Sequence, residues 1–228
     1  MHDPENTPPV NPLPPVVILL FVAVALPEVM FLLGAQGFVG GAEGLGWRLA
    51  AIKDYAFSPE LFDWMLSTGQ YLPQHMMRFV TYAFVNTGFT ATLFAAVLLL
   101  ALGKLVGETM GQVAVVVLYL GGSIFGALVY GLLLNDPAWL IGGFPGVYAL
   151  IGGYSFVMWR VLGATGQQQL RAFSLIAILL GIQLVFGVFF GPTTGWVADL
   201  AGFVFGFGAS ILLVPGGLAH FLAAMRRD

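Results

Sequence analysis

Hydrophobic residues gather along this chain in six long stretches separated mostly by short connections. Each stretch comes close to or exceeds the roughly 20 apolar residues that a helix needs to cross a bilayer. Two of them contain an acid, which is Glu28 beside Pro27 in the first and Asp199 in the sixth. The pattern predicts six transmembrane helices, at residues 16–38, 79–102, 113–134, 142–159, 172–190 and 196–214.

One connection is long, at residues 39–76. It mixes aromatic residues such as Trp47 and Trp64 with charged residues such as Lys53 and Asp54. This mixture is typical of segments that lie at headgroup level, where aromatic rings are enriched. We expect the segment to lie in the membrane interface; an ordinary solvated loop is the alternative interpretation.

The composition also indicates a lipid environment. Hydrophobic residues make up 59% of the 228 residues and charged residues only 8%, whereas soluble domains carry about 25% charged residues. The 31 glycines suit closely packed membrane helices. The absence of cysteine excludes disulfides and thiolate metal sites, and a net charge of −3 without a basic run argues against nucleic acid as a partner. We therefore expect the lipid bilayer as the partner, with no cofactor or metal.

The distribution of Lys and Arg predicts the orientation. With both termini in the cytoplasm, five of these residues lie inside and three outside, which has the sign of the positive-inside rule. The segment 39–76 is then external. We expect a disordered tail at 1–15, a membrane domain at 16–214 and a cytoplasmic tail at 215–228. The short loops and the lack of cysteine favour a bacterial inner membrane.

Small residues recur at the start of the fourth stretch and along the sixth. The sequence GGFPG holds Gly143 and Gly146, and ADLAGFVFG holds Gly202 and Gly206 in a G-x-x-x-G pattern that lets helices approach closely. Arg78 opens the second stretch, in RFVTYAFVNTGF. With six helices and a large first loop, these segments resemble the rhomboid family of intramembrane serine proteases over nearly the whole chain. The resemblance implies an all-α polytopic membrane protein, a six-transmembrane-helix rhomboid-like bundle.

The family's catalytic positions hold other residues here. A Gly-x-Ser-Gly motif supplies the family's serine nucleophile and an Ala-His-x-x-Gly motif supplies its histidine base; Pro145 and Asp199 stand in those places. Where the family has a His and an Asn that help to hold the oxyanion, this chain has Ala91 and Ala95. Acyl transfer needs a nucleophile beside a base, and one oxyanion donor can be worth about 2.7–4 kcal/mol of barrier. The resemblance thus implies a rhomboid fold without an intact catalytic set.

Other side chains do not restore a catalytic pair. The histidines lie outside the predicted helix cores, at His2, His75 and His220. We interpret the serines near helices as partners in local or interhelical hydrogen bonds; they are Ser123, Ser155, Ser174 and Ser210. The Trp47–Arg48 pair resembles a Trp-Arg pair in the first loop of some inactive rhomboid relatives.

Ionisable residues inside a membrane are functional candidates by default. For Glu28 we expect either protonation or a bond to a carbonyl freed by Pro27, which lacks the helix N–H. For Asp199 we expect hydration in an external cavity, with pairing to Arg78 as the alternative. Arg78 otherwise serves as an interfacial anchor. A catalytic dyad of Glu28 and Asp199 is disfavoured because the two acids are expected at different depths.

Three functional hypotheses follow. The first is an inactive, pseudoprotease-like member that binds transmembrane segments of client proteins without cutting them. The second is an active intramembrane serine-type endopeptidase, as the resemblance alone would suggest. The third is a small proton-coupled transporter that uses Glu28 and Asp199.

Overall fold

The computed structural model describes residues 12–134, 137–190 and 194–217. In these ranges the regular structure is helical, apart from an isolated bridge between Phe57 and Leu140. The expected all-α polytopic architecture is confirmed, and the chain is an integral, multi-pass membrane protein. Within the described ranges, the helices long and apolar enough to cross a membrane are α1 (Pro15–Ala35), α7 (Phe89–Met110), α8 (Gln112–Leu133), α9 (Phe144–Ala164) and α11 (Trp196–Leu213).

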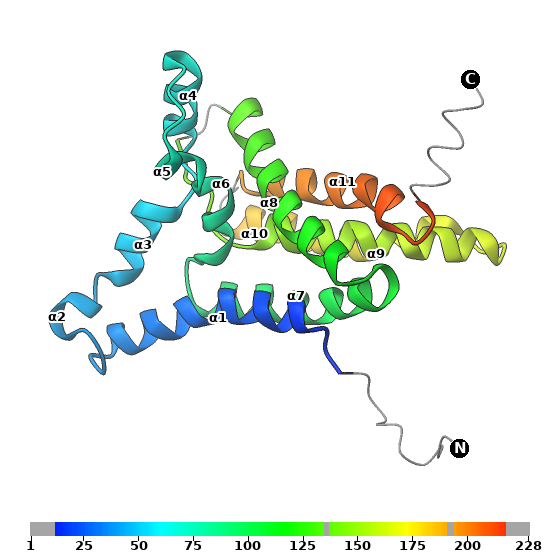
Figure 1. The fold of residues 1–228 in the computed structure, drawn as a ribbon, viewed down its shortest axis with the longest axis horizontal. Helices are drawn as coiled ribbons and strands as arrows, with labels where there is room; N and C mark the ends of the chain where they lie inside the picture. The colour runs from blue at the N-terminus through cyan, green and yellow to red at the C-terminus, as the bar shows by residue number, and fades with distance from the viewer. Residues whose placement is uncertain (1–11, 135–136, 191–193, 218–228) are drawn as a thin grey trace, which may run out of the picture.

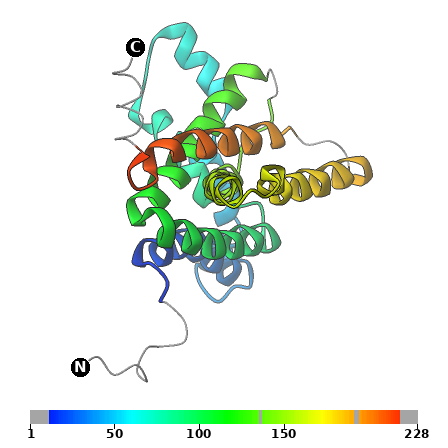
Figure 2. The same ribbon diagram turned by 90° about the vertical axis from the view of Figure 1, so that its right-hand side faces the viewer.

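Helix α9 lies at the centre of the bundle. It contacts α11, α8 and α7, and Figure 2 shows it nearly end-on between α11 and α7. From α1 through α9 the spans alternate in direction, whereas α9 and α11 run the same way, so that α11 ends on the side of the molecule where α1 begins (Figure 1). The core between these helices is apolar, with fully buried side chains such as Leu99, Leu118 and Leu150.

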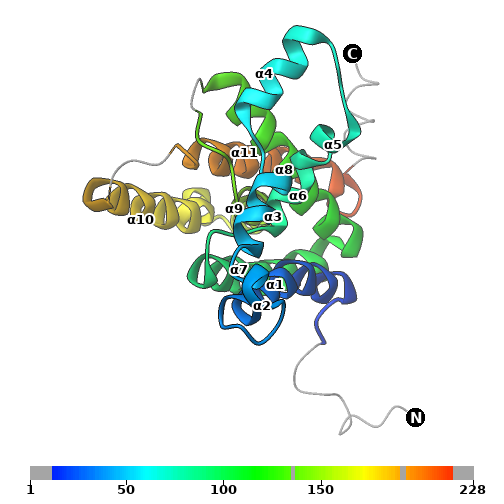
Figure 3. The ribbon, with the colours of Figure 1, turned by 90° about the vertical axis from the view of Figure 1, so that its left-hand side faces the viewer.

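The fifth predicted helix is shorter than the others. The 3-10 helix η3 (Gln169–Phe173) takes the start of the predicted segment, and α10 (Ser174–Phe190) has 17 residues. Helix α10 packs mainly on η3 and α9, and it extends to one side of the bundle (Figure 3). Exposed side chains along it include Ile178, Val185 and Phe189.

The predicted start of the second span, at residue 79, is wrong. Arg78 opens the short helix α6 (Arg78–Thr81), which is followed by the 3-10 helix η2 (Tyr82–Phe84). The chain is then extended at Val85 (φ −109°, ψ 120°) and again at Gly88 (φ 177°, ψ 173°). The residues between them are Asn and Thr, whose side chains compete with helical hydrogen bonds, so the spanning helix α7 begins only at Phe89.

The long connection at 39–76 is mostly helical rather than an open loop. It contains α2 (Gly41–Gly44), α3 (Trp47–Tyr55), α4 (Pro59–Thr68) and α5 (Pro73–Met76). Ser58 caps the N-terminus of helix α4, and its Oγ accepts a hydrogen bond from the Leu61 N–H at 3.4 Å.

Helix α4 is anchored to the bundle by aromatic packing. The ring of Phe62 packs against Phe57 and Phe79, with ring centroids 5.9 and 5.6 Å away. The outer side of α4 exposes Trp64 and Leu66. The outer side also exposes the acids Glu60 and Asp63, and the position of α4 at the membrane interface stays a prediction.

Candidate functional site

The turn before α9 brings the backbone close to its neighbours. Gly142 has a φ of +106°, which favours glycine, and its N–H donates to the carbonyl oxygen of Tyr82 at 3.0 Å. A Cβ atom at Gly143 would lie 2.5 Å from the hydroxyl oxygen of Tyr119. Pro145 occupies the first turn of α9, where the helix needs no N–H from it. The tight turn that the sequence predicts is therefore present, with the proline in the first helical turn.

Helix α11 packs on α9 through its glycines. A Cβ atom at Gly202 would collide with the carbonyl oxygen of Pro145, and one at Gly206 would collide with that of Ala149. Gly146 has a similar role toward α8, where an added Cβ would lie 2.7 Å from a backbone oxygen. The G-x-x-x-G pattern thus marks a face on which the two helix backbones touch.

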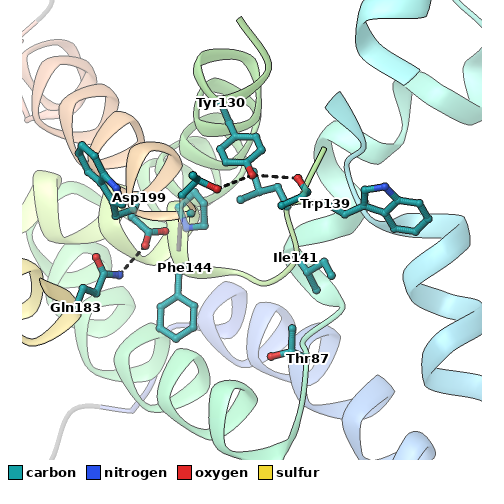
Figure 4. Close-up of a pocket in the computed structure, with 13 residues that line it drawn as sticks. Thr87, Tyr130, Trp139, Ile141, Phe144, Gln183 and Asp199 are labelled. Carbon is teal, nitrogen blue, oxygen red and sulfur yellow. Dashed lines mark hydrogen bonds between the residues drawn. The ribbon is translucent and has the colours of Figure 1, made fainter. Parts of the chain in front are cut away.

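A pocket of about 490 Å³ opens beside this turn. Pro145 of α9 and Asp199 of α11 both line it, so the structure brings together the two positions that the resemblance singled out. Figure 4 shows Asp199 and Gln183 close together on one side of the pocket. The lining also includes residues that bear hydroxyl groups, Thr87, Tyr130 and Thr194, and aromatic residues, Trp139, Phe144 and Trp196.

Asp199 is buried, with 6% of its surface exposed. Its Oδ2 accepts a hydrogen bond of 2.7 Å from the Nε2 of Gln183 on α10. Among the described residues its other oxygen has no hydrogen-bond donor, and no basic side chain forms an ion pair with it. The alternative of an Arg78–Asp199 pair is wrong, because Arg78 donates instead to the carbonyl oxygen of Ala56 at 3.0 Å. Arg78 thereby joins α6 to the end of α3.

Gln183 and Tyr130 are site residues that the sequence analysis missed. The Tyr130 hydroxyl donates to the carbonyl oxygen of Ala138 and lies 3.0 Å from the Oγ1 of Thr194. It therefore joins α8 to the segment before α9 and to the start of α11. An amide within an otherwise apolar stretch was the available signal for Gln183, since such a group needs a partner inside a membrane.

The two alanines from the oxyanion positions lie on α7. Ala95 is buried and Ala91 is half-buried. Neither residue lines the pocket as far as the described residues define it. Their methyl groups supply no hydrogen-bond donor in any case.

The serines that the sequence analysis named lie outside the described lining of the pocket, and Ser174 is exposed at the start of α10. Ser123 and Ser210 donate to the backbone oxygens four residues earlier, at 2.8 and 2.6 Å, as expected of helical serines. Ser155 is fully buried and has no hydrogen-bond partner in the part of the chain that the structure describes.

The described histidine lies away from the pocket. His75 packs edge-on against Trp64, with ring centroids 5.9 Å apart. His2 and His220 lie outside the described residues.

Glu28 belongs to a separate network. Arg48 donates from both terminal nitrogens to the Glu28 carboxylate, at 2.6 and 2.8 Å, and Thr92 Oγ1 donates to it at 2.9 Å. Arg48 also donates to the carbonyl oxygen of Asn86 at 3.0 Å and lies over the ring of Phe31. The expectation of a protonated Glu28, or one bonded to a free carbonyl, is therefore wrong, because a loop arginine enters from α3 to pair with it.

This network is a brace between the first loop and two spans. The hydrogen bonds to Glu28 raise the pKa of Arg48, so the guanidinium stays charged. Planar bidentate pairing of this kind fixes orientation as well as charge. The Trp47–Arg48 pair thus has a structural role, since its arginine holds α3 against α1 and α7.

Comparisons with known proteins agree with this architecture. No curated protein matches the sequence. The Rhomboid domain family matches residues 73–216, which covers the spans from α7 to α11, the pocket and both glycine motifs. This match extends over more than half of the chain, and the chain is therefore a member of the rhomboid family.

Proposed function

We propose that this rhomboid-family protein binds transmembrane segments of other membrane proteins and does not cleave them. The observation that carries the proposal is the pocket at the start of α9. Pro145 and Asp199 meet there, and the described lining contains no serine, histidine, cysteine or lysine. A peptidase of this type needs a nucleophile activated by an adjacent base.

The hydrogen bonding of Asp199 supports the same conclusion. A general base must reach the hydroxyl that it activates, at about 2.6–3.2 Å. Among the described residues, the donor to Asp199 is the Gln183 amide rather than a hydroxyl. The Thr194 hydroxyl is instead 3.0 Å from Tyr130.

The position of α10 supports access for a client helix. This helix packs mainly on η3 and α9, and its described hydrogen bond to α11 is the one from Gln183 to Asp199. A transmembrane segment that displaces α10 from α11 would reach the pocket from within the bilayer. We infer that clients approach on this side.

Crosslinking in reconstituted bilayers tests the proposal. A photoreactive residue at Phe144, in the pocket wall, is expected to capture a co-reconstituted single-span protein at its intact length. The same residue at Val117, on the outer surface of α8, serves as the control for random collisions. Equal capture at both positions would argue against a binding site.

Labelling with a fluorophosphonate separates this proposal from the peptidase hypothesis. We expect no covalent label and no cleavage product. Client cleavage that the same reagent blocks would overturn the proposal. Pro145→Ser alone is also expected to give no cleavage, because it restores neither a base nor the oxyanion donors.

The transporter hypothesis receives less support. Glu28 is bonded to Arg48 and Thr92, whereas Asp199 is bonded to Gln183, so the described structure gives the two acids separate partners. A proton path through both acids predicts pH-dependent flux in vesicles that Glu28→Gln abolishes. We expect no such flux.

A further inference from the structure

The pocket beside Asp199 is rich in hydrogen-bond acceptors that lack donors. One carboxylate oxygen of Asp199 has no donor among the described residues. The Oε1 of Gln183 is buried and also has none, because this amide uses its nitrogen to bond Asp199. Buried polar atoms normally have partners, and an orphaned one costs free energy. The open oxygen of Asp199 therefore favours a ligand that supplies a hydrogen-bond donor.

The charge of the site indicates the same kind of ligand. Asp199 is 6% exposed, and its described partner is a neutral amide. The described basic side chains are elsewhere: Arg48 pairs with Glu28, Arg78 bonds the Ala56 carbonyl, and none of the others lines the pocket. A buried carboxylate is stable only when it is paired or well hydrogen-bonded. A cation with several N–H groups meets both needs.

The aromatic walls add to this selectivity. Phe144 and Tyr130 line the same pocket as Asp199 (Figure 4), and so does Trp196. Aromatic faces attract ammonium and guanidinium groups, and this attraction is stronger when the site excludes water. The volume of about 490 Å³ is large enough for the end of a long side chain.

We propose that the pocket receives the Lys or Arg side chain of a client segment, with Asp199 as its counter-ion. This inference rests on the proposed function and names the class of client. Asp199 lies in the first turn of α11, so the basic residue belongs near the end of the client helix on that side of the membrane. Lys and Arg are tolerated at such positions because their long side chains extend toward the interface.

A peptide series on the unmodified protein provides the main test. Single-span peptides carry Lys, Arg, Gln, Met or Glu at one position near the end that meets the pocket, with the rest of the sequence unchanged. Binding is measured by energy transfer in nanodiscs of uncharged lipid. We expect Lys and Arg peptides to bind about tenfold tighter or more than the Gln peptide, because a charge-assisted hydrogen bond replaces a neutral one. The Glu peptide is expected to bind weakest.

Variants of the protein test which residue causes the preference for Lys and Arg peptides. Asp199→Asn is expected to remove the preference for Lys and Arg, because it removes the negative charge of the pocket. Glu108→Gln is the matched control, because it removes one negative charge from a residue outside the pocket that pairs with Lys104. This control is expected to keep the full preference.

The outcomes separate this inference from the proposed function. Equal binding of all five peptides would overturn the inference and leave the client-binding proposal standing. Failure of every peptide to bind would overturn both. Binding of free spermidine that depends on Asp199, with no peptide preference, would assign the site to small amines and overturn the assignment to client side chains.

Discussion

The two acids buried in this membrane protein, Glu28 and Asp199, have opposite surroundings. Glu28 is 4% exposed and accepts three hydrogen bonds, two of them from the charged Arg48. Asp199 is 6% exposed but accepts one hydrogen bond from a neutral amide, beside an open pocket. The comparison shows that an acid in an apolar helix is not by itself a functional site. The protein fills the hydrogen-bonding capacity of Glu28, which acts as a brace, and leaves part of that of Asp199 open, which is why we propose Asp199 as a binding group.

Loss of the arginine in the brace is expected to have the largest effect. Arg48→Ala leaves the Glu28 carboxylate buried without a cation, and we expect the free energy of unfolding to fall by about 3 kcal/mol. Unfolding by SDS in mixed micelles measures this change. Arg171→Ala, at an exposed arginine without a described partner, is expected to change stability by less than about 0.5 kcal/mol. A loss below about 1 kcal/mol in Arg48→Ala would mean that Glu28 does not depend on its pair.

The position of Asp199 depends on the packing of α11 against α9 rather than on a charged partner. Gly202→Ala places a methyl group against the Pro145 carbonyl oxygen and pushes the start of α11 away from α9. We expect a loss of about 2 kcal/mol and, in crosslinking assays, weaker client capture. Gly208→Ala is the matched control on the same helix, since a Cβ there meets nothing within 4 Å. Equal stability of the two variants would contradict the close α9–α11 contact.

Removing the charge from each acid gives the most direct comparison. Glu28→Gln is expected to cost about 1.5 kcal/mol, because it breaks a charge-assisted pair with Arg48. Asp199→Asn is expected to change stability by less than about 0.5 kcal/mol, since its Oδ1 can still accept from Gln183. Both variants are measured by the same unfolding assay. A larger loss for Asp199→Asn than for Glu28→Gln would reverse the assignment of brace and binding group.

The smallest expected effect comes from the hydroxyl that supports the brace. Thr92→Val removes one hydrogen bond to Glu28 while keeping a similar shape, and we expect a loss of about 1 kcal/mol. Thr90→Val, at an exposed threonine on the same helix, should be nearly neutral. Indistinguishable unfolding curves for the two variants would show that Arg48 alone satisfies Glu28.

Much of the membrane architecture could be predicted from hydropathy, because long apolar segments must form helices in lipid. The ends of the first, third and sixth spans were predicted within a few residues. The second span was placed too early because Asn86 and Thr87 are two polar residues among apolar neighbours. Hydropathy averaged over a whole span hides their effect on the local backbone. The helices of the segment 39–76 were missed because their apolar periodicity is short and mixed with charges.

The candidate site was only partly predictable. Pro145 and Asp199 were found through a resemblance in local motifs, but their shared pocket depends on contacts between residues more than 50 positions apart. The partner of Glu28 lies 20 residues later, in helix α3 of the first connection, whose path the sequence does not specify. Gln183 could be noticed as polar, but its direction toward Asp199 follows from how α10 lies against α11.

The sequence by itself determined that this chain spans the membrane, that glycine faces allow close helix contact, and that polar groups in the apolar stretches require partners. These properties are local, because they follow from residue type and spacing. Only the tertiary structure decided which partner each polar group received. Glu28 obtained a cation because α3 carries Arg48 back to α1, whereas Asp199 obtained an amide because no described basic side chain reaches the mouth of its pocket. The free energy of a buried charge depends on the atoms around it, and those atoms come from distant parts of the chain.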